Sequence, residues 1–183
     1  MTVARATQCF RAGEWPASAA RGTVTLAFAD RHRRRVRLTL DGAGGEIMLD
    51  LPRATRLLDG DGLQLSDGGW VLVRAACEDV LDIRAADGVG AMRIAWHLGN
   101  RHLPVQILPD GGLRILYDHV IAAMVGDLGG VTTRRRDIFA AEGGAYEGDA
   151  GGHHHSHSHH HSHAHRHDDG QDHHRQTGRE VEP

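Results

Sequence analysis

The sequence has no lysine, only two cysteines, and few aromatic residues, which make up 4% of its 183 positions. Cys9 and Cys77 are far apart and lack CxxC or His-paired spacing, so we expect both to be reduced and structural. The formal net charge is −3 with histidine counted as neutral. A chain so close to neutrality has no net charge that would attract nucleic acid or an anionic membrane.

Long hydrophobic runs and familiar catalytic motifs are also absent. The first ten residues form no apolar leader, and apolar runs such as 120–125 are far shorter than the about 20 residues that span a bilayer. The chain contains no GxSxG, P-loop or HExxH pattern and no recognisable Cys/His arrangement. We therefore expect a soluble, cytoplasmic protein that is not an enzyme.

Histidine is what the chain has in excess, since residues 153–174 hold twelve of its sixteen histidines. A purification tag or a drifted repeat would also be rich in histidine. This segment, however, is interspersed with Ser, Ala, Arg and Asp and continues into an ordinary polar end, which favours a native metal-binding tail. Neutral imidazole is the commonest protein ligand for zinc, nickel and copper. The candidate tail ligands are His153, His154, His155, His157, His159, His160, His161, His163, His165, His167, His173 and His174.

Such a composition cannot bury enough apolar surface to fold alone. We therefore expect residues 141–183 to be a Gly-rich linker, 142–152, followed by a disordered His-rich tail.

Residues 1–76 predict a small all-β domain. Apolar and polar residues alternate in short segments that turn signals separate, with no helical period. The expected strands are 23–29, 35–40, 46–51, 63–65 and 70–75.

Residues 77–140 predict a second domain that contains helices. A strand at 80–85 is followed by a helix that Asp87 caps and Gly99 ends as its C′ residue. A second helix begins after Asp118 and ends at Gly129 and Gly130. Together with strands at 105–108, 113–117 and 131–136, these elements give the order βαββαβ of a ferredoxin-like split βαβ fold. We expect an α+β protein whose second domain has an antiparallel sheet with both helices on one face.

Three histidines of the second domain are candidate metal ligands. His97 and His102 are five residues apart, so they do not share one helical face and should not chelate together. Spacing alone favours His97 as a residue packed against the sheet or hydrogen-bonded. His119 opens the second helix, where an exposed surface residue is the alternative reading.

The run HLGNRHLPVQILPDGGLRILYDHV, 97–120, closely resembles the signature of the UreE urease accessory proteins, which are nickel metallochaperones. The resemblance implies a homodimer joined through the ferredoxin-like domains. It also implies that His102 faces its twofold mate and binds a shared Ni(II) ion, with tail histidines or water completing the coordination. Imidazole ligands also bind Zn(II) and Cu(II), and they bind Cu(II) more tightly than Ni(II). Only the resemblance therefore identifies nickel as the metal.

His119 matches a peripheral metal site in some members of the family. Tyr117 stands where some of those members have a second histidine, which puts a two-histidine site in doubt. The resemblance assigns His97 no certain metal role. We expect Asn100 and Arg101 to set the turn that aims His102.

The first domain looks like the peptide-binding-type domain of the family. It implies contacts with the urease maturation complex, including the UreG GTPase. The basic runs 31–35 and 134–136 are either partner-facing or solvated strand faces.

An RNA-recognition module and a freestanding metal store are two other possible function classes. An RNA-recognition module would stack bases on aromatic residues of its sheet, and the candidate strands VLDIRA and VQIL carry none. A freestanding nickel or zinc store is the main alternative to a chaperone, because it would use the His-rich tail without any partner.

Overall fold

The structure is a computed structural model that describes residues 3–42 and 44–143. The predicted His-rich tail, including its twelve candidate ligands, lies outside the described residues. Within them, no helix is long and apolar enough to cross a membrane.

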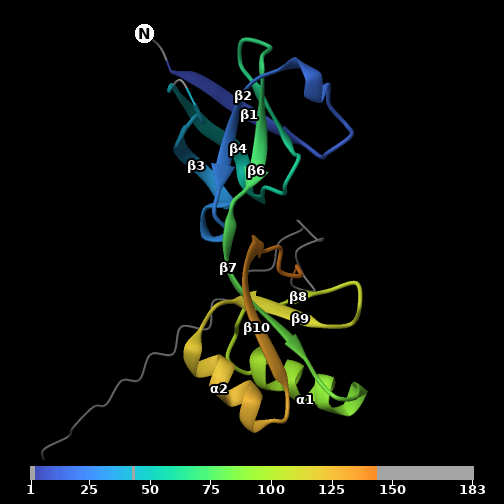
Figure 1. The fold of residues 1–183 in the computed structure, drawn as a ribbon. Coiled ribbons are helices and arrows are strands. Elements are labelled where there is room, and N and C mark those ends of the chain that lie inside the picture. Colours follow the sequence, from blue (N-terminus) through green and yellow to red (C-terminus); the bar gives the residue numbers. More distant parts are fainter. Residues whose placement is uncertain (1–2, 43, 144–183) are drawn as a thin grey trace, which may run out of the picture. The chain divides into compact units, whose positions relative to one another are not determined.

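The N-terminal part of the chain forms a six-stranded sheet with the strand order β2-β6-β5-β1-β4-β3 (Figure 1). Its inward-facing residues make a core that includes Val24, Leu49, Leu63 and Val73. Two 3-10 helices, Ala17–Ala19 and Phe28–Asp30, flank β2. The strands are β1 Ala4–Phe10, β2 Ala20–Leu26, β3 His32–Thr39, β4 Glu46–Arg56, β5 Gly62–Leu65 and β6 Trp70–Ala75.

The predicted strands are all present, but the sequence analysis missed β1. This strand runs through the middle of the domain, between β4 and β5. Its fully buried residue is Ala6, a small side chain that gives little alternation signal. Strand β4 also runs five residues beyond the predicted end at Leu51, to Arg56.

The second part of the chain has the predicted order βαββαβ, which confirms the α+β class. The four strands pair antiparallel in the order β10-β7-β9-β8. The elements are β7 Cys77–Arg84, α1 Gly88–Gly99, β8 Gln106–Ile107, β9 Leu113–Leu116, α2 His119–Asp127 and β10 Val131–Ile138.

Both helices pack on one face of this sheet, as predicted (Figure 1). Alternate residues of β7, Leu81 and Ile83, point to this face and lie opposite Ile115 and Leu113 of β9. One core cluster combines them with Ile94 and Leu98 of α1 and with Ile121 and Val125 of α2. The division of the chain into domains at residues 76 and 77 stays a prediction.

Side-chain caps begin both helices at the predicted residues. The carboxylate of Asp87 accepts a hydrogen bond from Gly90 N at 2.7 Å. The carboxylate of Asp118 accepts from Val120 N at 2.8 Å and from Ile121 N at 3.1 Å. These bonds satisfy N–H groups that have no partner within the helix.

The opposite face of the four-stranded sheet carries a buried charge network. Arg114 is 7% exposed and Asp82 is 5% exposed. Arg114 Nε and Nη2 lie 2.6 and 3.1 Å from the two Asp82 oxygens, and Arg114 Nη2 also lies 2.8 Å from Asp137. Arg135 reaches the same Asp82 carboxylate at 3.1 Å. The two buried charged groups of this network, Arg114 and Asp82, are therefore each paired with groups of opposite charge.

We predict that Asp82→Ala lowers the free energy of unfolding by about 3–5 kcal/mol, because it leaves the buried Arg114 guanidinium without its main partner. Urea denaturation monitored by circular dichroism measures this loss. Asp79→Ala is the matched control, since it removes a carboxylate of the same strand whose pair with Arg134 is about half exposed. An equally large loss in the control would contradict the role assigned to the buried pair.

Candidate metal centre

His102 lies in the turn that ends helix α1. Its backbone has φ +54°, and it is the only non-glycine residue with positive φ among the residues that the structure describes. His102 N donates to Gly99 O at 2.9 Å, and Leu103 N donates to Leu98 O at 3.3 Å. These two bonds form a Schellman motif with His102 as its C′ residue.

The prediction that Gly99 is the C′ residue is therefore wrong. Gly99 is the last residue of the helix, and the chain makes three more residues of turn before it reverses. The hydrophobic contact that usually accompanies this motif sets the position, because Leu98 belongs to the core cluster of the second sheet and the partly buried Leu103 packs against that cluster. Packing of these leucines places the left-handed residue at His102.

Such a position normally belongs to glycine. A side chain with a Cβ atom in the left-handed region costs about 1–2 kcal/mol, whereas glycine adopts it without this penalty. The second helix follows the usual rule, because Gly129, with φ +80°, is the C′ residue of α2. This agrees with the prediction that Gly129 and Gly130 end the helix. The exposed imidazole of His102 is thus kept at the end of α1 at a cost in stability. Backbone strain of this kind is concentrated at functional sites.

His97 occupies the last turn of α1 and is half-buried. Its ring packs edge-on against the neighbouring Trp96, with ring centroids 4.9 Å apart. Arg101 Nη1 donates to His97 O at 2.9 Å, so Arg101 caps the helix end as well as forming part of the turn. The half-buried ring and its contact with Trp96 are consistent with a packing role for His97.

His119 is exposed at the first position of α2. The guanidinium of Arg134 lies over the ring of the nearby Tyr117, 4.0 Å from its centroid, and pairs with Asp79 at 3.2 Å. The positive end of the α2 helix dipole disfavours a bound cation at this first position of the helix. Binding of metal by His119 stays a prediction.

Among the described residues, no group of three or more His, Cys, Asp or Glu side chains could hold a metal ion. His97, His102 and His119 therefore do not form one site within a single copy of the described chain. A tight site that uses His102 needs ligands from a second copy of the chain or from residues after 143.

The last described residues lie beside the strand that follows His102. Glu142 N donates to Val105 O at 2.8 Å, and Ala140 N donates to Gln106 Oε1 at 3.0 Å. Val105 is only three residues after His102. The last described residues are thus hydrogen-bonded to residues three and four positions after His102.

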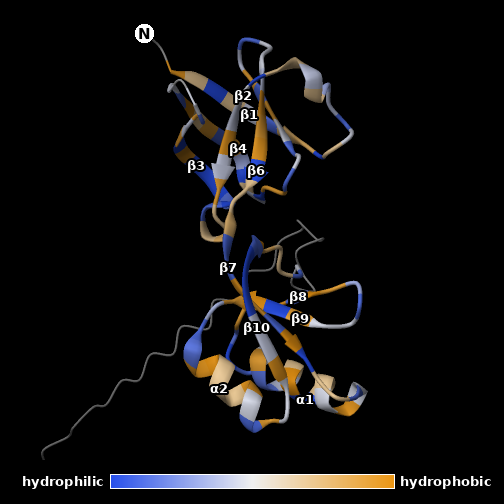
Figure 2. Cartoon of the chain, in the orientation of Figure 1, coloured by the Kyte–Doolittle hydropathy of each residue, from blue (hydrophilic) through white to orange (hydrophobic). Residues whose placement is uncertain are grey.

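Helix α1 also presents an exposed apolar stripe that the sequence analysis did not recognise as surface. Val89, Met92 and Trp96 are 60%, 66% and 63% exposed. Their spacing of three and four residues places them on one side of the helix. Figure 2 shows that hydrophobic residues recur along α1. The buried residues of the helix are only Ile94 and Leu98. The sequence did contain a signal for this exposed stripe. The apolar residues of α1 occupy a wider arc of the helix than one sheet can cover.

Comparison with known proteins matches both parts of the chain. Residues 5–76 match the family model described as the N-terminal domain of the UreE urease accessory protein, and residues 78–175 match the model of its C-terminal domain. The second match includes the His-rich segment.

Curated relatives align over most of the chain. The urease accessory protein UreE of Bradyrhizobium sp. (strain ORS 278) is 49% identical over 142 residues, which are 78% of this chain and 66% of the relative. That of Bordetella pertussis (strain Tohama I) is 46% identical over 135 residues, 73% of this chain and 64% of the relative. A bifunctional urease accessory protein UreEF of Bordetella bronchiseptica is also 46% identical, over 30% of its length. The alignments to the two UreE proteins span about two thirds of their length.

We predict that His102→Gly is more stable than His102→Ala by about 1 kcal/mol, because only glycine relieves the left-handed backbone. The measurement is urea denaturation without metal. The control is the same pair of substitutions at His97, inside the helix, where glycine should instead be less stable than alanine by about 1 kcal/mol. The same order at both positions would show that residue 102 is not held in the left-handed conformation in solution.

Proposed function

Because the chain belongs to the family of UreE urease accessory proteins, which are accessory proteins of urease maturation and not enzymes, we propose that it is a cytoplasmic nickel metallochaperone. It binds Ni(II) as cargo and delivers it to the urease active site while urease matures. Nickel is proposed on the family's role, since imidazole ligands alone do not select this ion.

The observation that carries this proposal is the conformation of His102. An exposed histidine at the C′ position costs stability that glycine would avoid, so a function of the side chain explains its presence. The turn around it is short, and it is anchored by Leu98 in the core and by Leu103 packed against that core. A ligand in such a turn needs little ordering when a metal ion binds.

A homodimer supplies the second ligand. A twofold axis turns one well-placed imidazole into a pair. The apolar stripe of Val89, Met92 and Trp96 supports such an interface, because exposed apolar residues gathered on one helix face favour burial against a partner. The stripe and His102 belong to the same helix and its terminal turn. Contact between two α1 helices would therefore bring the two His102 residues of the dimer toward each other.

Tail histidines complete the coordination in this proposal. The hydrogen bond from Glu142 N to Val105 O holds the end of the described chain beside Val105, which is three residues after His102. About ten Gly-rich residues separate it from His153, and a flexible chain of that length has a reach of roughly 17 Å. A tether whose reach is comparable to the distance it must span gives a high effective concentration of ligand. His119 is at most a peripheral ligand, because a metal ion bound there would face the positive end of the α2 dipole.

The partners that we propose are the urease maturation complex and its UreG GTPase. Mobile imidazoles that replace ligands one at a time allow an ion to pass from carrier to acceptor without becoming free. A metal store would hold its ions instead. Exchange with a partner is therefore the property that distinguishes the proposed chaperone from a store.

We predict that a chain ending at residue 143 binds roughly one Ni(II) per dimer, the number expected for one site on a twofold axis, while the full chain binds several. In the shorter chain, His102→Ala should abolish the tight site, and His97→Ala should leave it nearly unchanged. Isothermal titration calorimetry gives both stoichiometry and affinity, with sedimentation to verify the dimer. Equal stoichiometry in the long and short chains would rule out tail ligands, and tight binding by His102→Ala would rule out the shared site.

We predict that nickel passes from the loaded protein to the UreG GTPase in the presence of GTP and of a chelator that traps free nickel. The yield on the GTPase should not depend on the chelator concentration, because ligand exchange never releases the ion. Metal analysis after separation of the proteins measures it. If nickel stays on the protein or appears only on the chelator, the chain is a store.

Lowering the pH from about 7.5 to 5.5 should release the nickel ions, because protons compete with nickel for imidazole, whose ordinary pKa is near 6.5.

A further inference from the structure

The four-stranded sheet has a recess on the face that lies opposite the helices. Its volume is about 420 Å³, which is within the range of about 300–1,000 Å³ for small-molecule sites. On β7, Asp82 and Arg84 alternate with the helix-facing Leu81 and Ile83, which places them on this other face. The turn between β8 and β9 closes one side. The lining consists of the turn residues 108–110 and of Asp82, Arg84, Arg114 and Arg135 on three strands.

The turn that closes the recess is apolar on this side and fixed in shape. Leu108 N donates to Gly112 O and Gly111 N donates to Leu108 O, both at 2.8 Å. Asp110 Oδ1 accepts from Gly112 N at 3.2 Å. Leu108 and Pro109 line the recess on this turn. An occupant with an apolar body would cover them, whereas a bare oxyanion would leave them in water.

Arg84 is fixed on one side of the recess by contact with the turn. Its guanidinium lies so close to Gly112 that a Cβ atom at this glycine would overlap it. Arg84 Nη1 also donates to Ile83 O at 3.2 Å, and Nη2 pairs with Asp110, whose side chain is 60% exposed. Such an exposed pair contributes little to stability and exchanges with water and other anions. The glycine therefore positions a positive charge that a ligand can share with Asp110.

Arg135 contributes the second accessible guanidinium. It lies opposite Val80 in the register of β10 and β7, so it shares the face of Asp82. Arg135 Nε is 3.1 Å from Asp82 Oδ2, and its two terminal nitrogens have no hydrogen-bond or ion-pair partner among residues 3–42 and 44–143. Both oxygens of Asp82 already accept from Arg114. A planar guanidinium with free terminal N–H groups matches the two oxygens of a carboxylate.

The lining has one positive charge in excess, because three guanidiniums and two carboxylates form it. Asp137 also pairs with Arg114 at 2.8 Å, but it lies outside the lining and is 44% exposed, so solvent weakens its effect on the recess. One added negative charge therefore complements the recess. A dianion such as phosphate would meet a larger repulsion from Asp82 and Asp110.

We propose that this recess binds a small organic molecule with one carboxylate group and a short apolar body. The carboxylate accepts hydrogen bonds from the terminal nitrogens of Arg135, and Arg84 supplies a second positive charge. The apolar body lies on Leu108 and Pro109. This inference goes beyond the proposed function, because the site involves neither a metal ion nor the His102 turn.

The test follows the amide chemical shifts of the metal-free full chain with three probes. They are isocaproate, the uncharged isocaproamide of the same shape, and inorganic phosphate. Isocaproate should shift residues 82–84, 108–114 and 133–135 with a dissociation constant of about 1 mM, as expected for a ligand of about eight non-hydrogen atoms. The amide should bind about fivefold more weakly, which is the effect of losing one exposed ion pair. Phosphate should also bind more weakly, because it lacks the apolar body.

Matched variants separate the proposed contact from general attraction by positive charge. Arg135→Gln should weaken isocaproate binding about fivefold, because it removes one ion pair. Arg136→Gln is the control, since this exposed arginine points to the other face of β10 and donates to Cys77 O at 2.8 Å. It should leave the affinity unchanged. Arg84→Gln should weaken binding of isocaproate but not of the amide. Thermal unfolding verifies that each variant is folded.

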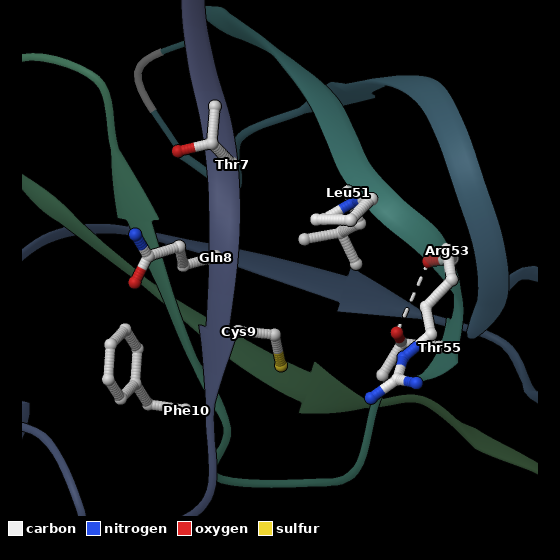
Figure 3. Close-up of a pocket in the computed structure, with 8 residues that line it drawn as sticks. Thr7, Gln8, Cys9, Phe10, Leu51, Arg53 and Thr55 are labelled. Atoms are coloured by element: carbon white, nitrogen blue, oxygen red, sulfur yellow. Dashed lines mark hydrogen bonds between the residues drawn. The ribbon is translucent and has the colours of Figure 1, made fainter. Parts of the chain in front are cut away.

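A cavity in the six-stranded sheet serves as an internal control. It has a volume of about 580 Å³, and Figure 3 shows Cys9 pointing into it from β1, with Leu51 and Arg53 on the facing strand. Arg53 is the only charged residue among the described residues of its lining, so a carboxylate there meets one guanidinium without a second. At the same concentration, isocaproate should therefore shift residues 7–10 and 51–55 less than the residues of the recess.

Several outcomes would overturn the proposal. They are no saturable shift at about 10 mM isocaproate, tenfold above the expected constant, equal binding of isocaproate and its amide, or phosphate binding as tight as that of isocaproate. Equal effects of the variants at 135 and 136, or shifts centred on residues 7–10 and 51–55, would overturn it as well. Because no metal is present, none of these results bears on the nickel titrations. Failure of this inference is therefore distinguishable from failure of the proposed function.

Discussion

The pair of main-chain hydrogen bonds that closes the end of α1 is the constraint on which the candidate site depends. Leu98 anchors one end of this turn in the core, and Leu103 anchors the other by packing against that core. Because both ends are fixed, the residue between them must adopt the left-handed conformation, and the chain has histidine there. The core of the second sheet thus determines where the imidazole lies, although the imidazole itself is exposed.

This arrangement divides the proposed metal chemistry between two kinds of ligand. His102 is held by a packed turn and loses little conformational freedom on binding. In the proposed mechanism the tail histidines are many and can replace one another as ligands. A fixed ligand contributes affinity, while interchangeable ligands allow stepwise replacement. A carrier needs both properties, since an ion that is held only by fixed ligands leaves slowly.

Much of the fold could be predicted from the sequence because its signals are local. The caps at Asp87 and Asp118, the C′ glycine at 129 and the change from strand to helix periodicity together give the βαββαβ order. The end of α1 could not be predicted in the same way. Gly99 carries the usual local signal, but the long-range packing of Leu103 extends the turn to residue 102. The motif at residues 97–102 could be recognised in the sequence, whereas the backbone conformation of its last residue could not be predicted from it.

Features that depend on neighbours distant in the chain were missed for the same reason. Strand β1 has alanine at its most buried position, and its place in the middle of the sheet depends on partners 40 to 60 residues away. The exposure of Trp96 likewise depends on how much of α1 the sheet can cover.

The charge network of Asp82, Arg114 and Arg135 has a consequence for assembly. Two copies of a sheet with a bare apolar face would stack through those faces. Here such stacking would have to remove water from Arg135, which is half exposed, and from the partly exposed Asp137. Desolvation of charges is costly unless new partners replace the water. The network therefore selects against face-to-face pairing of the sheets and leaves the helical side, with its exposed Trp96, as the favourable route to a symmetric oligomer.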